Sequence, residues 1–233
     1  MFEDLKARVA EANKRIVKEG LVKLSFGNVS GLSDDGKYFA IKPSGVHYDS
    51  LTPDDMVVVN VEDGSVIEGK HKPSSDTPTH LYLYQNLKGI KGIVHTHSPF
   101  ATSFCQAKMP LHCYGTTHAD HFNGTVPVSR DLSTAEINLD YELNTGKAIA
   151  EAFGSVNHLE VPACLVAYHG PFVWGKSVDD AVENAIALEE VSKMAISMKN
   201  MLGGMPCSIP KPLLERHYNR KHGKGAYYGQ GKK

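Results

Sequence analysis

Two Asp-Gly pairs near the N-terminus, each between short apolar segments, are the feature that most restricts the fold of this chain. Residues 24–45 contain the pair at 35 and 36, and residues 55–69 contain the pair at 63 and 64. An Asp-Gly pair between two segments that favour extended structure predicts a β-hairpin. Two successive hairpins indicate antiparallel pairing, in contrast to the regular strand–helix alternation of a Rossmann or TIM-barrel fold.

Helical segments are expected before and after the hairpins. The first has apolar residues at helical spacing: Leu5, Val9, Ala12 and Ile16. The others begin with a capping residue or an early proline and cover residues 74–89, 98–108, 133–154 and 177–201. Two more strands are predicted over residues 92–98 and 163–170. We therefore predict one α/β domain over residues 1–233, with three layers in which helices flank a central, mainly antiparallel sheet.

Charge and composition argue against several classes of protein. The 25 basic and 26 acidic residues leave a formal net charge of −1, which gives no global field for nucleic acid or a membrane surface. The N-terminus lacks the apolar stretch of a signal peptide, and no segment approaches the ~18 apolar residues of a membrane span. The four cysteines form no C-x-x-C pair, so we expect a reduced, cytoplasmic protein. No glycine-rich nucleotide motif occurs, so a nucleotide cofactor is not expected.

Two histidines one residue apart end the strand predicted over residues 92–98. In an extended segment, His95 and His97 would share one face and lie about 7 Å apart, because side chains alternate between faces. Two imidazoles at that separation can converge on one metal ion. A catalytic zinc site usually has three protein ligands and an open position, so other segments must supply the rest.

Asp76 and His169 are candidates for the missing ligands because each lies at the end of a predicted element, where sites are often built. Asp76 also suits a helix N-cap, and His169 also suits a turn before Gly-Pro. A rival cluster lies at His118, Asp120 and His121, which could bind metal or supply acid–base groups. Spacing alone leaves both clusters open.

Three short loops in the first third of the chain share the chemistry of an anion site. Residues 26–30, 42–45 and 72–76 offer hydroxyl groups and a flexible backbone, and the last two include a lysine. Such loops bind phosphate through N–H and O–H donors. Ser74 and Ser75 also precede a predicted helix, whose dipole favours an anion. The three loops together predict a phosphate site beside a candidate metal ligand.

The order of these motifs along the chain is similar to that of a known enzyme family. The motifs are SFGNVSG, IKPSGV, KPSSDTPTH, IVHTHSPFAT, HADHF, YHGPFVWG and HYNRKHGKGAYYGQ. Together they span about residues 26–230. The set resembles the L-ribulose-5-phosphate 4-epimerases, which belong to the class II aldolase/epimerase (fuculose-phosphate aldolase) superfamily.

The resemblance implies a role for each group of residues. It implies one zinc ion per chain, held by Asp76, His95, His97 and His169. It implies a phosphate site formed by Gly27, Asn28, Lys42, Ser44, Gly45, Ser74 and Ser75. The implied acid–base pair is Asp120 and Tyr228, with Tyr227 as the second choice for the tyrosine, and the implied supporting residues are Thr116 and His217. In the implied homotetramer, a subunit's acid–base pair and its tail, residues 209–233, would meet the zinc of a neighbouring subunit.

The implied reaction is inversion at C4 of L-ribulose 5-phosphate in pentose catabolism. Because C4 is not adjacent to the C2 ketone, its hydrogen is not acidic, and cleavage and re-formation of the C3–C4 bond avoid its removal. In the family's aldolases, a glutamate stands at the position of Asp76. The shorter carboxylate favours the epimerase over an aldolase acting on fuculose or rhamnulose phosphate. The complete ligand set argues against a non-catalytic interaction module, and the net charge argues against a nucleic-acid-binding tail.

Overall fold

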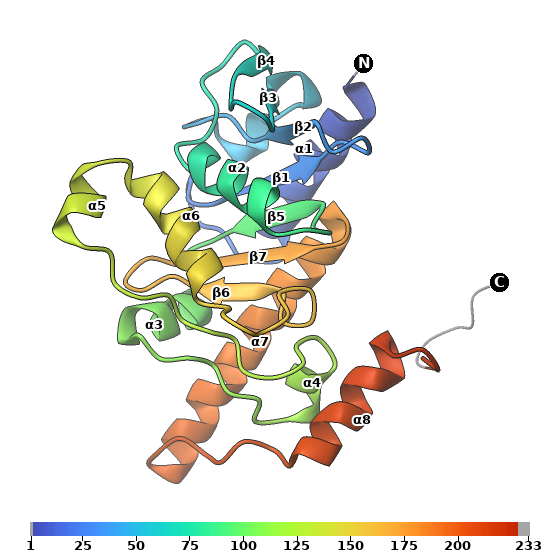
Figure 1. Ribbon diagram of the computed structural model, residues 1–233, viewed down its shortest axis with the longest axis vertical. Coiled ribbons are helices and arrows are strands. Elements are labelled where there is room, and N and C mark those ends of the chain that lie inside the picture. The colour runs from blue at the N-terminus through green and yellow to red at the C-terminus, as the bar shows by residue number, and fades with distance from the viewer. Residues whose placement is uncertain (1, 228–233) are drawn as a thin grey trace.

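The computed structural model describes residues 2–227, and its centre is a seven-stranded sheet (Figure 1). The strands lie in the order β4-β3-β2-β1-β5-β7-β6, and every neighbouring pair is antiparallel. Their bounds are β1 Asn28–Leu32, β2 Tyr38–Ile41, β3 Val57–Asn60, β4 Val66–Glu68, β5 Gly92–His95, β6 Ala163–Leu165 and β7 Pro171–Gly175. The two hairpins predicted from the Asp-Gly pairs are confirmed as β1-β2 and β3-β4.

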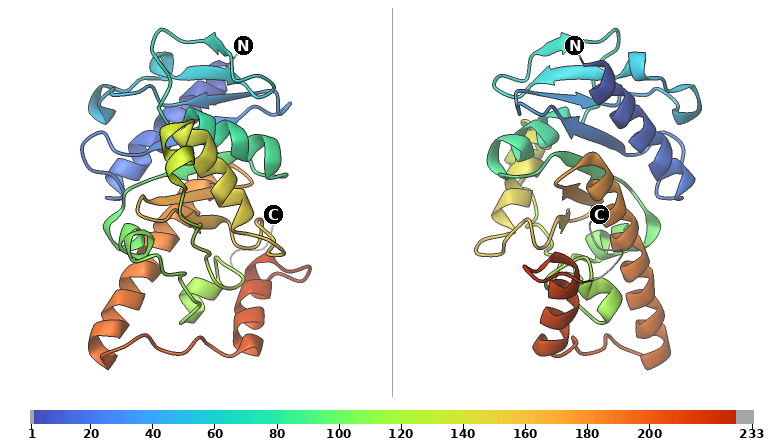
Figure 2. Two further views of the ribbon diagram at one scale, coloured as in Figure 1. Left: turned by 60° about the vertical axis from the view of Figure 1, so that its left-hand side comes forward. Right: turned by 90° about the vertical axis from the view of Figure 1, so that its right-hand side faces the viewer.

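Helices lie on both sides of this sheet, as predicted (Figure 2). α1 and α7 cover one face, and α2 covers the other with α6 packed against it. The helix bounds are α1 Glu3–Lys18, α2 Thr77–Asn86, α3 Pro99–Ala107, α4 Thr116–Ala119, α5 Thr134–Asn138, α6 Tyr141–Glu151, α7 Val178–Leu202 and α8 Lys211–His222, with short 3-10 turns η1 Tyr48–Ser50 and η2 Pro53–Asp55. The α/β class and the three-layer arrangement are therefore confirmed.

Successive residues of β1 show how the two faces are specified. The side chain of Asn13, in α1, bonds both the N–H and the carbonyl of Val29. The next residue along the strand is Ser30. Its hydroxyl lies 2.7 Å from Nδ1 of His80 and 2.8 Å from the hydroxyl of Tyr84, both in α2. Since side chains alternate along a strand, one strand contacts both helical layers.

Two glycines allow α7 to pack directly on β5 and β7. A Cβ added at Gly92 would lie 2.6 Å from Cα of Val178, and one added at Gly175 would lie 2.4 Å from the backbone nitrogen of Ala181. Any larger residue would push the helix from the sheet. β5 and β7 are paired in the sheet beneath this helix, and the candidate metal ligands lie near the opposite ends of these strands.

The last part of the chain leaves the three layers. The C-terminal half of α7 extends beyond the sheet, and the chain returns through α8, which lies beside α4 (Figure 1). Because residues 209–233 are basic and rich in glycine and proline, we predicted no helix there. Residues 211–222 contain no glycine, however, and they form a helix with Pro212 in its first turn.

The helix expected over residues 133–154 is two helices. The predicted capping box of Ser133 and Glu136 is present and starts α5. Asp140 then adopts a left-handed conformation, with φ of 55°, which turns the chain before α6 begins at Tyr141.

The strand expected over residues 163–170 ends at Leu165. Val166 donates its N–H to the carbonyl of Gly170, 3.2 Å away, and Tyr168 is left-handed with φ of 63°. His169 therefore lies in a turn, so the prediction that the strand continues through it to residue 170 is wrong. β5 also ends before its second histidine, at His95.

Candidate active site

Three histidines from two parts of the chain converge at one end of the sheet. The ring centroids of His95 and His97 are 4.9 Å apart, and that of His169 is 4.8 Å from the first and 4.9 Å from the second. One ligand atom from each ring lies within 4.8 Å of the others. β5 and β7 bring them together, because His95 pairs with Phe172 across the sheet and the turn before β7 therefore lies beside the end of β5.

The surrounding residues orient two of these rings. Nδ1 of His95 donates to the carbonyl of Pro171 at 3.0 Å, and the ring stacks on Phe172 with centroids 4.2 Å apart. Nδ1 of His169 lies 3.3 Å from the hydroxyl of Tyr141. Because Nδ1 of each of these two histidines has a hydrogen-bond partner, Nε2 is the ring nitrogen available to bind an ion. Burial lowers the pKa of His95, and burial with the neighbouring imidazoles lowers the pKa of His169 to about 4. Both rings are thus neutral near pH 7, as metal ligation requires.

The carboxylate of Asp76 lines the same cavity as the three imidazoles. The residue lies at the N-cap position of α2, but its side chain makes no capping hydrogen bond. Instead, Nδ2 of Asn28 donates to Oδ2 of Asp76 at 2.7 Å. Burial acts to raise the pKa of this carboxyl, but nearby His95 and His80 and the Asn28 bond outweigh it, so the pKa lies below its ordinary value. An ionised carboxylate beside three neutral imidazoles is a donor set that suits a divalent metal.

The residues predicted to bind phosphate line this cavity too, which has a volume of about 360 Å³. They are Gly27, Asn28, Lys42, Ser44, Gly45, Ser74 and Ser75. The loops at residues 42–45 and 72–76 lie together because Pro43 and Pro73 form an isolated antiparallel bridge. Lys42 is 2% exposed, and its Nζ lies 4.6 Å from the centroid of the Tyr48 ring. The cavity thus combines hydroxyl donors and a cation with the metal-ligating side chains.

Two polar features of the cavity wall bear on ligand binding. Oδ1 of Asn28 is buried and has no hydrogen-bond partner within residues 2–227, although Nδ2 of the same amide is bonded. The hydroxyl of Tyr48 donates to the carbonyls of Gly27 and Phe26, at 2.7 and 3.0 Å. Tyr48 was not predicted as part of the site. It lies 21 residues from Gly27 along the chain and outside the three donor-rich loops, so no local pattern pointed to it.

The acid–base candidate Asp120 does not line this cavity. It lies at the end of α4, where Nη2 of Arg220 is 2.6 Å from Oδ2 and Nδ1 of His217 is 3.2 Å from Oδ1. Partial burial acts to raise the pKa of Asp120, but these two partners hold it below its ordinary value. Thr116 begins the same helix and likewise lies outside the cavity lining, and Tyr228 is outside the described residues.

The structure does not bring the rival cluster together as a metal site. His118 is 3% exposed, and its Nε2 donates to the carbonyl of Gly124 at 2.7 Å. His121 lines a different cavity, beside Tyr218 and His222. Within residues 2–227, one group of three potential ligands has donor atoms close enough to share an ion. It consists of His95, His97 and His169.

Comparison with known proteins gives the family of this chain. Residues 7–196 match the family described as "Class II Aldolase and Adducin N-terminal domain". The chain belongs to the class II aldolase family. Its relatives include L-ribulose-5-phosphate 4-epimerase UlaF of Salmonella paratyphi A, which is 48% identical over 229 residues. This alignment covers 98% of the present chain and 100% of the relative.

Further relatives in the class II aldolase family give the same picture. UlaF of Salmonella paratyphi B is 47% identical over the same coverage. Among solved structures, an L-fuculose 1-phosphate aldolase superposes with a TM-score of 0.78 at 26% identity, with 93% of this chain and 95% of that one covered. Over residues 2–227, no helix has both the length and the apolar character that crossing a membrane would require.

Proposed function

We propose that this class II aldolase-family chain is an L-ribulose-5-phosphate 4-epimerase that forms D-xylulose 5-phosphate in pentose catabolism. One observation carries the proposal: the histidine group, Asp76 and three donor-rich loops share one cavity of about 360 Å³. A sugar phosphate needs a site for its phosphate and a polar group beside its reacting carbons. The loops offer the first, and the histidine group with Asp76 offers the second. The 48% identity to the UlaF epimerases supports this substrate. The proposal includes a cytoplasmic location, as expected from the cysteine pattern.

In this proposal, zinc is held by His95, His97, His169 and Asp76. When bound, the ion supplies Lewis-acid stabilisation of the negative charge that develops at the carbonyl end of the substrate. The buried Lys42 and the serine hydroxyls hold the phosphate, and with it the two-carbon aldehyde fragment released when the C3–C4 bond breaks. Retention of this fragment lets its aldehyde rotate and the bond re-form on the opposite face.

Inversion places the C4 oxygen on two different sides, so two proton-transfer groups are needed. We assign these roles to Asp120 and Tyr228, with Thr116 and His217 as supporting residues. Since Asp120 lies outside the cavity of its own chain, we propose a homotetramer in which the tail, residues 209–233, and α4 of one subunit complete the cavity of the next. The lowered pKa of Asp120 keeps its carboxylate ionised near pH 7, the form that can accept a proton.

Aldolase cleavage of a ketose 1-phosphate is the second candidate, because a fuculose 1-phosphate aldolase shares the fold over nearly the whole chain. The two activities give different products. Incubation with fuculose or rhamnulose phosphate would release dihydroxyacetone phosphate and an aldehyde only if the chain is an aldolase.

The first test is turnover of L-ribulose 5-phosphate in heavy water. We expect D-xylulose 5-phosphate with no deuterium at C4, because carbon–carbon cleavage never removes the C4 hydrogen, and we expect loss of turnover with a chelator. The product is identified by NMR and mass spectrometry. Stoichiometric deuterium at C4 would contradict the cleavage route, and absence of product would contradict the epimerase assignment.

The second test separates two adjacent tyrosines. Tyr228→Phe is expected to lower kcat by roughly 10²–10⁴-fold, the typical contribution of a general acid–base group. Tyr227→Phe is the matched control, because it removes the same hydroxyl from a side chain that is 69% exposed. We expect it to keep kcat near that of the unaltered enzyme. The reverse pattern would transfer the acid–base role to Tyr227.

A further inference from the structure

His169, like His97, lies outside the strands of the sheet. His95 lies within β5, donates to Pro171 and stacks on Phe172. His169 lies in the turn between β6 and β7, after the left-handed Tyr168. The contact that orients its ring through Nδ1 comes from another layer of the fold, the hydroxyl of Tyr141 at 3.3 Å.

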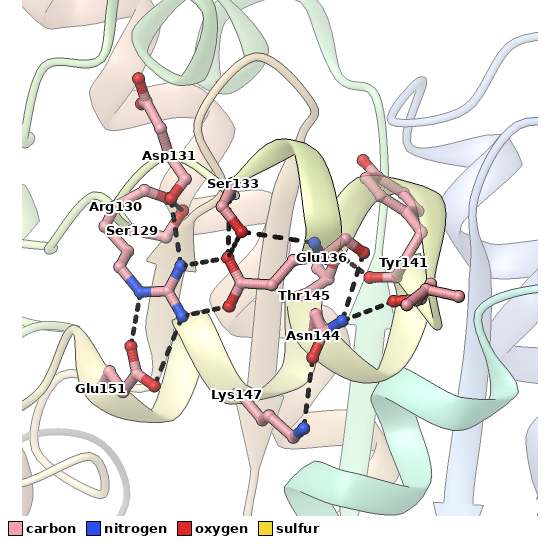
Figure 3. Close-up of polar contacts among 11 residues, drawn as sticks. Ser129, Arg130, Asp131, Ser133, Glu136, Tyr141, Asn144, Thr145, Lys147 and Glu151 are labelled. Carbon is pink, nitrogen blue, oxygen red and sulfur yellow. Dashed lines mark hydrogen bonds and ion pairs between the residues drawn. The ribbon is translucent and has the colours of Figure 1, made fainter.

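Tyr141 is itself held at a corner that the chain builds with many polar contacts (Figure 3). It is the first residue of α6 and follows the left-handed Asp140. Nδ2 of Asn144 donates to the carbonyls of Leu139 and Glu136, at 2.7 and 3.2 Å. These bonds join α6 to a carbonyl of α5 and to the carbonyl of the residue that follows α5, and so restrict the direction in which α6 starts.

An arginine joins the two helices of this corner. This residue is Arg130 (Figure 3). Its Nη1 and Nη2 lie 2.9 and 2.8 Å from the carboxylate of Glu136 in α5, and its Nε lies 2.6 Å from the carboxylate of Glu151 in α6. Exposed ion pairs of this kind contribute only about 0–1 kcal/mol to stability, because water screens them. The bidentate geometry nevertheless restricts the angle between α5 and α6.

We propose that Tyr141 is a positioning residue for His169, and that the α5–α6 corner sets the affinity of the histidine group for its metal. This inference rests on the metal site of the proposed function. When Nε2 of His169 is the ligand atom, Nδ1 carries the proton and donates it to the oxygen of Tyr141. The bond selects one tautomer and one ring direction before metal binds. Without the hydroxyl, the neighbouring rings still pack against His169, but no bond to Nδ1 selects its tautomer and ring direction, and metal binding must do so.

Tyr141→Phe tests this with zinc as the probe and a competing chromophoric chelator as the readout. We expect zinc to bind roughly 10–100-fold more weakly, the usual cost of losing a group that orients a metal ligand. The thermal unfolding midpoint of the metal-free protein should stay unchanged, since the ring remains. Tyr82→Phe is the matched control: it removes the same hydroxyl from a tyrosine whose ring lies beside Gly146 of α6, and it leaves the contact with His169 in place.

Arg130→Met tests the corner. Alone, it should weaken zinc binding; combined with Tyr141→Phe, it should add no further loss, because the corner acts only through that hydroxyl. Equal zinc affinity of Tyr141→Phe and the unaltered chain would overturn the inference, and full additivity in the double variant would overturn the corner's part in it. Failure of the unaltered chain to bind zinc would instead overturn the proposed metal site itself.

Discussion

Replacing His97 with asparagine is expected to abolish both metal retention and turnover. The histidine group is the densest set of potential ligands in residues 2–227, and His97 is its most exposed member, so the substitution leaves the buried core unchanged. Loss of a residue that merely orients a ligand costs roughly 10–100-fold in affinity, and loss of a ligand itself should cost more. Metal content after dialysis and kcat should fall together.

The control for this variant is His121→Asn. His121 belongs to the rival cluster and lines a different cavity, so metal content and kcat should both be retained. Full metal occupancy in His97→Asn, with loss in His121→Asn, would show that the ion binds at the rival cluster.

Replacing Asp120 with asparagine is expected to lower kcat by roughly 10²–10⁴-fold while metal content persists. Asp120 lies apart from the histidine group, and its carboxylate is the proposed proton-transfer group. Because Arg220 and His217 pair with it, the unfolding midpoint must be measured alongside kcat. Glu215→Gln is the control: it removes a carboxylate from α8, the helix that carries His217 and Arg220, where Glu215 pairs with Lys211 at 3.5 Å, and kcat should not change.

These two variants together also test whether the active site is shared between subunits. In oligomers that contain both variants, a His97→Asn subunit offers an intact Asp120 to the intact histidine group of an Asp120→Asn subunit. Co-expression should therefore restore part of the activity that neither variant has alone. No recovery in verified mixed oligomers would mean that each active site is built within one chain.

The local elements of this fold were predictable because their signals are local. An Asp-Gly pair allows the tight turn of a hairpin, and this places β1 beside β2 and β3 beside β4. The hydroxyls of Ser133 and Ser177 accept from backbone N–H groups three residues on, so they start α5 and α7 where the sequence predicts. The pairing of His95 with His97 is likewise local, since one residue separates them.

The places where prediction failed are those where a single backbone conformation overrides a pattern. Asp140 and Tyr168 have positive φ, which non-glycine residues seldom adopt, and each ends an element that the apolar pattern would continue. Such conformations persist only because surrounding contacts hold them, as Asn144 does for the corner at Asp140.

The hairpins, most helix starts and the residue types of the candidate site can be predicted from the sequence, because turns, caps and periodicity depend on a few neighbouring residues. Which of these residues meet depends on the tertiary structure. Sheet order puts His169 beside His95, and the bridge of Pro43 and Pro73 joins two donor loops. The packing of α8 on α4 ties Asp120 to Arg220, 100 residues away. These contacts follow from how apolar faces pack in three layers, which no short segment encodes.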